Sequence, residues 1–332
     1  MRASSCPSRT ATPHTRHPTL AEFVEATTKE FGIPGAAVGV WADGREVYAC
    51  HGVTGVDNPL PVDERTVFVL GSVTNTFTAT VLMRLVEEGR IELDAPVRRY
   101  VPELVLAHER AAAEIAVLHL LNHTAGLEWN LVVDTGERDD ALAGFVARLD
   151  ELRQIAPPGA RASYSQAGFN LAGRTIEKVT GLTYEQAVAR SVFAPLGLSH
   201  SFFAPSDAMT RRFAVGHNVD EAGTMTTARM SKGNRGESPG GGIVSSVADQ
   251  LRQARFHIGD GRLEGAERVL SAELVHRMRQ PTAELRAGTL GDAFGICWFL
   301  RDVDGNQAGG PRGLGRRDAG GLPAGEHRPA AR

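Results

Sequence analysis

Ser72 is the residue whose position first suggests chemistry, because it stands just before or within the first turn of an expected helix. A serine there ordinarily caps the helix by accepting a hydrogen bond from a free backbone N–H group. The same hydroxyl becomes a nucleophile when a base activates it. Lysine is scarce in this chain, so an amine base has three candidates, which are Lys29, Lys178 and Lys232.

The other residue types that bind metals or phosphate do not form a recognisable site. The three cysteines are odd in number and far apart, which fits no disulfide framework and no pair of metal ligands. His217, His257 and His327 are equally scattered. Glycines 240–242 resemble a tight turn before a helix, because no lysine with serine or threonine follows them as in a phosphate loop. We therefore expect no metal and no cofactor.

Charge and hydropathy argue against two classes of partner. The net charge of −3 provides no basic surface for nucleic acid or for anionic lipid. No apolar run reaches the roughly 18 residues that a membrane helix needs, and the N-terminus lacks the apolar segment of a signal peptide. We expect a soluble, cytoplasmic protein with no nucleic-acid or membrane partner. The oligomeric state is not predicted.

The hydrophobic pattern outlines the elements that would position Ser72. A helix from about residue 20 should stop at Gly32, and two strands should follow, joined at Asp43-Gly44. After Ser72, an apolar helical face is formed by Phe77, Val81, Leu82, Leu85 and Val86. Further helices are expected up to Gly126, over 142–152, up to Gly181, over 183–198 and after a cap at Ser245 or Ser246, and a strand is expected within 291–305.

Four sequence blocks together resemble the serine β-lactamase-related family, which includes class C β-lactamases, DD-peptidases and esterases. They are VLGSVTNTFTATVLMRLVEEGRIELDAPV, LLNHTAGL, YSQAGFNLAGRTIEKVTG and GGGIVSSVAD. The resemblance runs from about Leu20 to Gly305 and implies catalysis through an acyl-enzyme. It also implies that His123, within the second block, has a structural role.

The first motif of that family is Ser-x-x-Lys, in which the lysine one turn after the serine helps to remove its proton. Here the motif is Ser72-Val73-Thr74-Asn75. The resemblance thus makes Ser72 the nucleophile and places Asn75 where the lysine should be. A neutral amide has no basic lone pair near pH 7, so we expect Ser72 to be poorly activated. Lys232 could replace the lysine only if its loop folded over the site.

The second motif, Tyr-x-Asn, corresponds to Tyr164-Ser165-Gln166. The resemblance implies that Tyr164 relays the proton and that Gln166 replaces the asparagine that holds the substrate amide. The alternative for Tyr164 is a packed loop tyrosine with its hydroxyl outward. Gln166 keeps an amide on a longer stem and should shift the substrate. Without the motif lysine, Tyr164 also lacks the cation that would lower its pKa from about 10.

The third motif, Lys-Thr-Gly or His-x-Gly, should follow the strand near residue 300 and is missing. Residues 307–311 read Gln-Ala-Gly-Gly-Pro instead. The strand that carries this motif normally supplies a second N–H group to the oxyanion, so its loss would weaken electrostatic catalysis. From Asn306 on, the chain is dominated by Gly, Ala, Pro and Arg and cannot bury enough apolar surface to order itself.

We therefore predict an α+β, β-lactamase/transpeptidase-like fold, with an antiparallel sheet from N- and C-terminal strands, helices on both faces and a mainly helical region. The sheet should be incomplete at the C-terminus, which would leave the edge near residues 36–40 unpaired and stability low. The expected divisions are a disordered leader (1–18), the hydrolase domain (19–305) and a disordered tail (306–332). Within the domain, the sheet occupies 31–70 and about 290–305, and the helical region about 72–290.

The predicted function is hydrolysis of a small ester or amide, β-lactam or D-amino peptide-like, through an acyl-enzyme at Ser72, with activity weakened or lost because of Asn75. The alternative is a pseudoenzyme that binds small acyl or peptide ligands, or a protein partner, without turnover. A degraded gene product with no function of its own is a third interpretation. Fold analogy does not select the substrate.

The abrupt change of composition where the third motif is due leads to a testable hypothesis, namely that the tail from about Asn306 is translated out of frame. The alternative is a natural low-complexity tail. Translation of the downstream DNA in the other two frames should reveal a His-x-Gly or Lys-Thr-Gly block followed by strand-like sequence. If neither frame contains such a block, the hypothesis is wrong.

Overall fold

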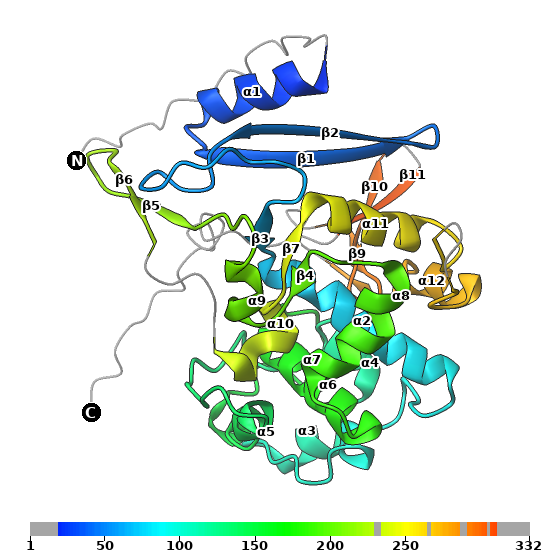
Figure 1. Cartoon of the computed structure of the whole chain (residues 1–332). Coiled ribbons are helices and arrows are strands. Elements are labelled where there is room, and N and C mark those ends of the chain that lie inside the picture. Colours follow the sequence, from blue (N-terminus) through cyan, green and yellow to red (C-terminus); the bar gives the residue numbers. More distant parts are fainter. Residues whose placement is uncertain (1–18, 229–233, 264–266, 286–290, 304–305, 311–332) are drawn as a thin grey trace, which may run out of the picture.

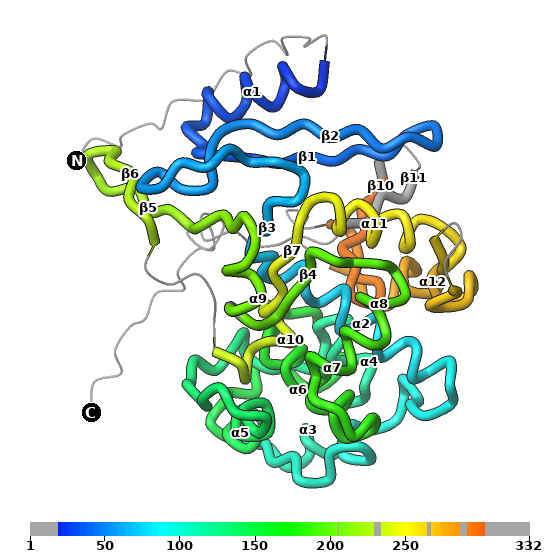
Figure 2. The backbone as a smooth tube through the Cα atoms, in the orientation of Figure 1, coloured from blue at the N-terminus to red at the C-terminus, as the bar shows by residue number. Residues whose placement is uncertain are grey.

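The computed structural model describes residues 19–228, 234–263, 267–285, 291–303 and 306–310. Figure 1 shows a β-hairpin with one helix above it, and beneath it a body of helices with short strands between them. The smooth trace in Figure 2 follows the same path and shows that helices from the middle of the chain make up most of this body. This α+β arrangement is the predicted fold class.

The N-terminal elements follow the prediction closely. Helix α1 (Leu20–Glu30) begins with a capping box between Thr19 and Glu22. Strands β1 (Gly35–Ala42) and β2 (Arg45–Gly52) pair antiparallel. The two residues between them, Asp43 and Gly44, both have positive φ angles, of 51° and 75°, as the predicted two-residue hairpin turn requires. Helix α1 covers one face of this hairpin (Figure 1).

Helix α2 (Thr74–Glu87) forms the centre of the helical body. Its predicted apolar face is confirmed, because Phe77, Val81, Leu82 and Leu85 are at most 3% exposed. Helix α6 (Gln166–Thr180) packs against it and ends at Gly181 in the left-handed conformation, as predicted. The other α-helices are α3 (Glu109–Glu114), α4 (Val117–Leu121), α5 (Ala141–Val146), α7 (Tyr184–Val188), α8 (Ala194–Leu196), α9 (Pro205–Met209), α10 (Ser238–Gly241), α11 (Val247–Ile258) and α12 (Ala272–Met278).

The prediction of a single helix that runs to Gly126 is wrong. Helices α3 and α4 are separated by an extended residue, Ile115, and α4 already ends at Leu121. The next residue, Asn122, stops the helix, because its side-chain oxygen accepts hydrogen bonds from both the backbone N–H and the hydroxyl of Thr124. The residues between this turn and Gly126 are therefore not helical.

The region predicted as mainly helical also contains strands that the sequence did not indicate. Strands β7 (Val244–Ser246) and β4 (Ser201–Phe202) form a small sheet with β3 (Val67–Val69), which lies in the predicted sheet region 31–70; the order is β3-β7-β4. Strands β5 (His217–Val219) and β6 (Met225–Thr227) form a separate hairpin. These strands are too short to show an alternating pattern, which explains why they were missed. Ser246 caps α11, as one of the two predicted residues.

The C-terminal strands correct the predicted boundary at residue 305. Strand β11 (Asn306–Gly310) pairs with β10 (Phe299–Val303), and the sheet continues through β9 (Ala293–Phe294) to β8 (Ala283–Glu284). Residues 306–310 therefore belong to the sheet and not to a disordered tail. Pairing through backbone groups needs no apolar side chain, so composition was a poor guide. The leader 1–18 and residues 311–332 lie outside the described residues.

The two terminal groups of strands remain separate within the described ranges. Strands β1 and β2 form a sheet of their own, and no ladder joins them to β8–β11 in the part of the chain that the structure describes. Val40, Trp41 and Val47 near the hairpin tip are 39% to 50% exposed. Among the described helices, none is both long enough and apolar enough to cross a bilayer.

The turn after α4 allows a prediction about stability. Gly126 has φ +72°, and a Cβ atom there would overlap the carbonyl oxygen of Ala156. Gly181 has nearly the same φ, +71°, but open space around it. Replacement by alanine should cost about 1–2 kcal/mol at Gly181, for the backbone conformation alone, and about 2–5 kcal/mol at Gly126, where overlap adds to it. Urea unfolding of both variants measures the difference, and equal losses would contradict the described turn.

Candidate active site

Ser72 lies in a single 3₁₀ turn, Gly71–Val73, that leads directly into α2. The turn is attached to the segment before β7: Leu70 N donates to the carbonyl of Ile243 at 2.9 Å, and Ile243 N donates to Thr74 Oγ1 at 3.2 Å. The residue that flanks α2 is Val73, and no side chain caps the helix. The ordinary capping role of Ser72 is therefore not what the structure shows.

Tyr164 is held directly before the N-terminus of α6. Ser165 caps this helix, accepting a hydrogen bond from Gly168 N at 3.1 Å, and its hydroxyl donates to the carbonyl of Glu128 at 3.0 Å. Gln166 N donates to the carbonyl of Trp129 at 2.7 Å. These bonds attach the start of α6 to residues 128–129 and so fix the peptide that carries Tyr164.

The structure brings Ser72, Asn75 and Tyr164 together from two helices. Asn75 Nδ2 donates to Tyr164 Oη at 3.1 Å, and the Ser72 hydroxyl lies close enough to the same phenol to lower its pKa. Asn75 is 3% exposed, and its Oδ1 atom is buried without a protein partner. The three side chains form a close group with no charged member. The alternative of a loop tyrosine with its hydroxyl outward is thereby excluded, since the Tyr164 hydroxyl accepts a hydrogen bond from the buried Asn75.

Burial raises the pKa of Tyr164 above its ordinary value. The hydrogen bonds from Ser72 and Asn75 act in the opposite direction but do not outweigh burial, and the buried Cys297 thiol adds to the increase. None of the groups that act on this phenol is a cation. Tyr164 therefore remains a neutral phenol at pH 7 and cannot by itself take the proton of Ser72.

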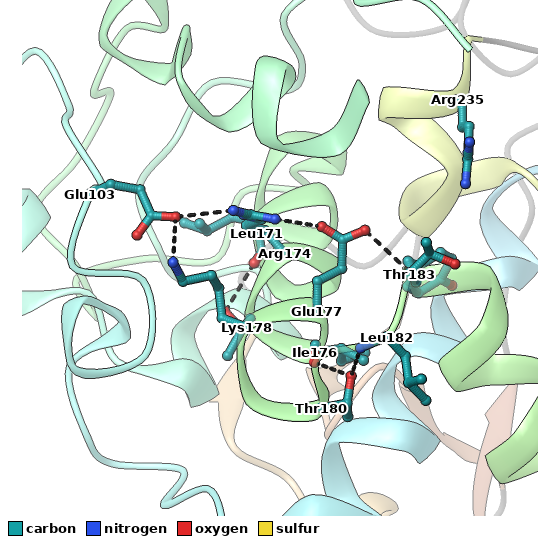
Figure 3. Close-up of polar contacts among 12 residues, drawn as sticks. Glu103, Leu171, Arg174, Ile176, Glu177, Lys178, Thr180, Leu182, Thr183 and Arg235 are labelled. Carbon is teal, nitrogen blue, oxygen red and sulfur yellow. Dashed lines mark hydrogen bonds and ion pairs between the residues drawn. The ribbon is translucent and has the colours of Figure 1, made fainter. Parts of the chain in front are cut away.

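The described lysines are engaged elsewhere. Figure 3 shows Lys178 on α6 pointing to Glu103, which also contacts Arg174. The Lys178 Nζ to Glu103 Oε1 distance is 3.1 Å. Lys29 pairs with Glu25 on α1. Lys232, the third candidate, lies outside the described residues. Within the described ranges, no lysine thus replaces the one missing at position 75.

Gln166 lies at the other side of the same region. Its side chain packs so closely on α10 that a Cβ atom at Gly240 would overlap its Cγ. Asn170, one turn later on α6, accepts a hydrogen bond from Gly240 N at 3.1 Å. Glycines 240–242 therefore allow close contact between two helices, and Gln166 borders the turn that carries Ser72 through Gly241 and Gly71.

Sequence reasoning missed Phe299, whose ring stacks near Tyr164 with a centroid distance of 6.4 Å. Phe299 comes from β10, which continues into β11 where the third motif was expected. No local signal connects these residues, because they are far apart in the sequence. His217 Nε2 accepts a hydrogen bond from Val56 N, and His257 is buried beside Trp298. The described residues contain no cluster that could hold a metal ion, and His327 lies outside them.

Comparisons with known proteins agree with this geometry. Residues 20–321 match the Beta-lactamase family. The chain is 33% identical over 293 residues to penicillin-binding protein 4 of Amycolatopsis lactamdurans, covering 87% of this chain and 77% of the relative. The octameric penicillin-binding protein homologue from Pyrococcus abyssi matches with a TM-score of 0.73 and 26% identity over 86% of this chain and 65% of that protein.

A second solved structure, class C β-lactamase from Rhodobacter sphaeroides, matches with a TM-score of 0.68 and 26% identity over 84% of this chain and 74% of that protein. Fold and site together define the class of serine hydrolases of the β-lactamase and DD-peptidase type. This chain belongs to the β-lactamase family. It spans only 65% of the length of the Pyrococcus protein.

The surroundings of Tyr164 predict how its phenol titrates. Because burial outweighs the two hydrogen bonds, its pKa should lie above the ordinary value of about 10. In Asn75→Lys, a nearby ammonium group should lower this pKa, since an opposite charge favours the phenolate. Nuclear magnetic resonance of ¹³Cζ-labelled tyrosine measures both values, and Tyr164→Phe assigns the signal. An unchanged pKa in Asn75→Lys would show that position 75 does not face the phenol.

Proposed function

We propose that this protein is a serine hydrolase that transfers an acyl group to Ser72 from a small ester or amide. The close group of Ser72, Tyr164 and Asn75 at the N-terminus of α2 supports this proposal. In the first step, the Ser72 oxygen attacks the carbonyl carbon and its proton passes to the Tyr164 oxygen in the small fraction of molecules in which Tyr164 is a phenolate. Collapse of the tetrahedral intermediate breaks the ester or amide bond, and Tyr164 returns the proton to the leaving group. Water then releases the acyl group by the reverse proton path.

The absence of a base next to Ser72 predicts slow turnover. Tyr164 is a phenol of raised pKa, so only a small fraction is phenolate at neutral pH. Asn75 donates to the phenol oxygen but has no lone pair basic enough to accept a proton. Loss of general-base assistance typically costs about 10²- to 10⁴-fold in rate. The positive end of the α2 dipole still favours a developing oxyanion.

The names of the relatives support a substrate class. Their names include a penicillin-binding protein and a class C β-lactamase, which supports β-lactam or D-amino peptide-like carbonyl compounds and leaves simple esters as a further candidate. Gln166, at the edge of the site, would contact the substrate amide through a longer side chain than asparagine. The proposed acyl transfer uses no cofactor. The cytoplasmic location remains a prediction from the sequence.

One observation favours a second function, a pseudoenzyme that binds acyl or peptide ligands, or a protein partner, without turnover. Asn75 Oδ1 is buried without a protein partner, and all three side chains of the group are neutral. A neutral group of donors and acceptors can bind a carbonyl compound without activating a nucleophile. Under this function the geometry would be retained for recognition only.

Covalent labelling distinguishes the two functions. A fluorophosphonate or penicillin probe should label Ser72 of the unmodified protein slowly, and Asn75→Lys should increase the labelling rate by about 10²- to 10⁴-fold, because an amine base is restored. Mass spectrometry of the labelled peptide locates the adduct. Ser72→Ala is the matched control and should remain unlabelled.

Three outcomes are informative. Label on Ser72 that increases in Asn75→Lys supports the hydrolase. Saturable binding of the penicillin probe by calorimetry, with no adduct in either protein, supports the pseudoenzyme. Label that persists in Ser72→Ala at the original rate would refute Ser72 as the nucleophile.

A further inference from the structure

His123 lies against Tyr164 and holds the backbone on both sides of it. The carbonyl oxygen of His123 accepts a hydrogen bond from Ser163 N at 2.7 Å. The ring atom Nδ1 accepts one from Ser165 N at 3.2 Å. The imidazole also packs on the ring of Tyr164, with a centroid distance of 4.4 Å and an angle of 33°. One residue thus restrains both neighbouring peptides and the aromatic ring.

The surroundings of His123 keep its ring neutral. The side chain is 3% exposed, and the rings of Phe169 and Phe294 lie at centroid distances of 5.1 and 5.0 Å. Burial lowers the pKa of His123 to about 3. A protonated imidazole would carry hydrogen on both nitrogens and could not accept from Ser165 N. The acceptor at Nδ1 is therefore present throughout the neutral pH range.

The backbone of His123 has a strained conformation, which costs free energy. Its φ angle is +58°, and among the described residues only Asp43, His123 and Cys297 are non-glycine residues with positive φ. Asp43 belongs to the hairpin turn, whereas the other two act on Tyr164. Cys297 N donates to the carbonyl of Leu121 at 2.9 Å, which connects the two strained segments. Such strain costs about 1–3 kcal/mol and persists where the surroundings require it, often at functional sites.

We propose that His123 is the positioning residue of the candidate active site. It holds Tyr164 so that the phenol oxygen meets both Ser72 and Asn75. The chain of contacts runs from Nδ1 and the carbonyl of His123, through the peptides of Ser163 and Ser165, to the Tyr164 hydroxyl. His123 does not touch the substrate and exchanges no proton. This inference rests on the proposed function in one respect: the position of Tyr164 matters for catalysis only if Tyr164 carries the proton of Ser72.

Substitution of His123 by leucine tests this role, and the same substitution at His257 is the matched control. His257 is equally buried, at 2% exposed, and has a pKa lowered to about 3, but it packs against Trp298 and Phe256. His123→Leu and His257→Leu should both lower thermal stability. Only His123→Leu should also move the Tyr164 ¹³Cζ signal and lower its pKa toward 10, because the phenol would gain solvent.

A conservative variant separates positioning from packing. Asparagine tolerates a positive φ and supplies an oxygen acceptor close to the place of Nδ1, so His123→Asn should retain most of the Tyr164 signal. His123→Phe keeps the aromatic volume but lacks the acceptor, and it replaces His123→Leu if that variant does not fold. In the Asn75→Lys background, Ser72 labelling should decrease about 10- to 100-fold in His123→Leu or His123→Phe and recover in His123→Asn.

The two readouts keep this inference separate from the proposed function. If Ser72 resists labelling but His123→Leu still moves the Tyr164 signal, the proposed function is refuted and the positioning role stands. If Ser72 is labelled and the Tyr164 signal is the same in His123→Leu and the parent protein, the positioning role alone is refuted. An equal movement of that signal in His257→Leu would also overturn it.

Discussion

The candidate site depends on one interaction, the hydrogen bond from Asn75 Nδ2 to the phenol oxygen of Tyr164, which the Ser72 hydroxyl also approaches. It connects the start of α2 with the start of α6, two helices that are far apart in the sequence. The Asn75 amide donates a hydrogen bond to the phenol oxygen, but it brings no full charge. This group thus holds two hydroxyls close together but includes no charge that would help to ionise either of them.

The geometry is tolerant of that loss because it is fixed by packing outside the reacting group. Helix α2 bonds to the neighbouring elements through buried threonines: Thr78 contacts Tyr184 Oη and the carbonyl of Pro239. Gly173 on α6 leaves room for the ring of Pro239. These contacts position the helix axes, and a change of side chain at position 75 does not remove any of them. The positions of the two helices therefore do not depend on the side chain at position 75.

The terminal strands contribute unequally to this scaffold. Strands β9 and β10 bring Phe294 and Phe299 against His123 and Tyr164, so they complete the aromatic surroundings of the phenol. The hairpin β1–β2, by contrast, packs with α1 and α11 and leaves its tip exposed. The exposed tip lies apart from the buried core that supports α2 and α6. Stability of the hairpin and integrity of the site are thus partly separable properties of this protein.

The sequence alone determined the features that depend on neighbouring residues: the turn at Asp43-Gly44, the buried face of α2, and the end of α6 at Gly181. The roles that it assigned to Ser72, Asn75, Tyr164 and Gln166 remain predictions. It failed where contacts between distant segments decide. The break after Leu121, the strand at 306–310, and the place of Phe299 depend on partners that no local pattern reveals. The left-handed turn at His123 is of the same kind, because the rings of Tyr164, Phe169 and Phe294 that pack on this residue come from distant parts of the sequence.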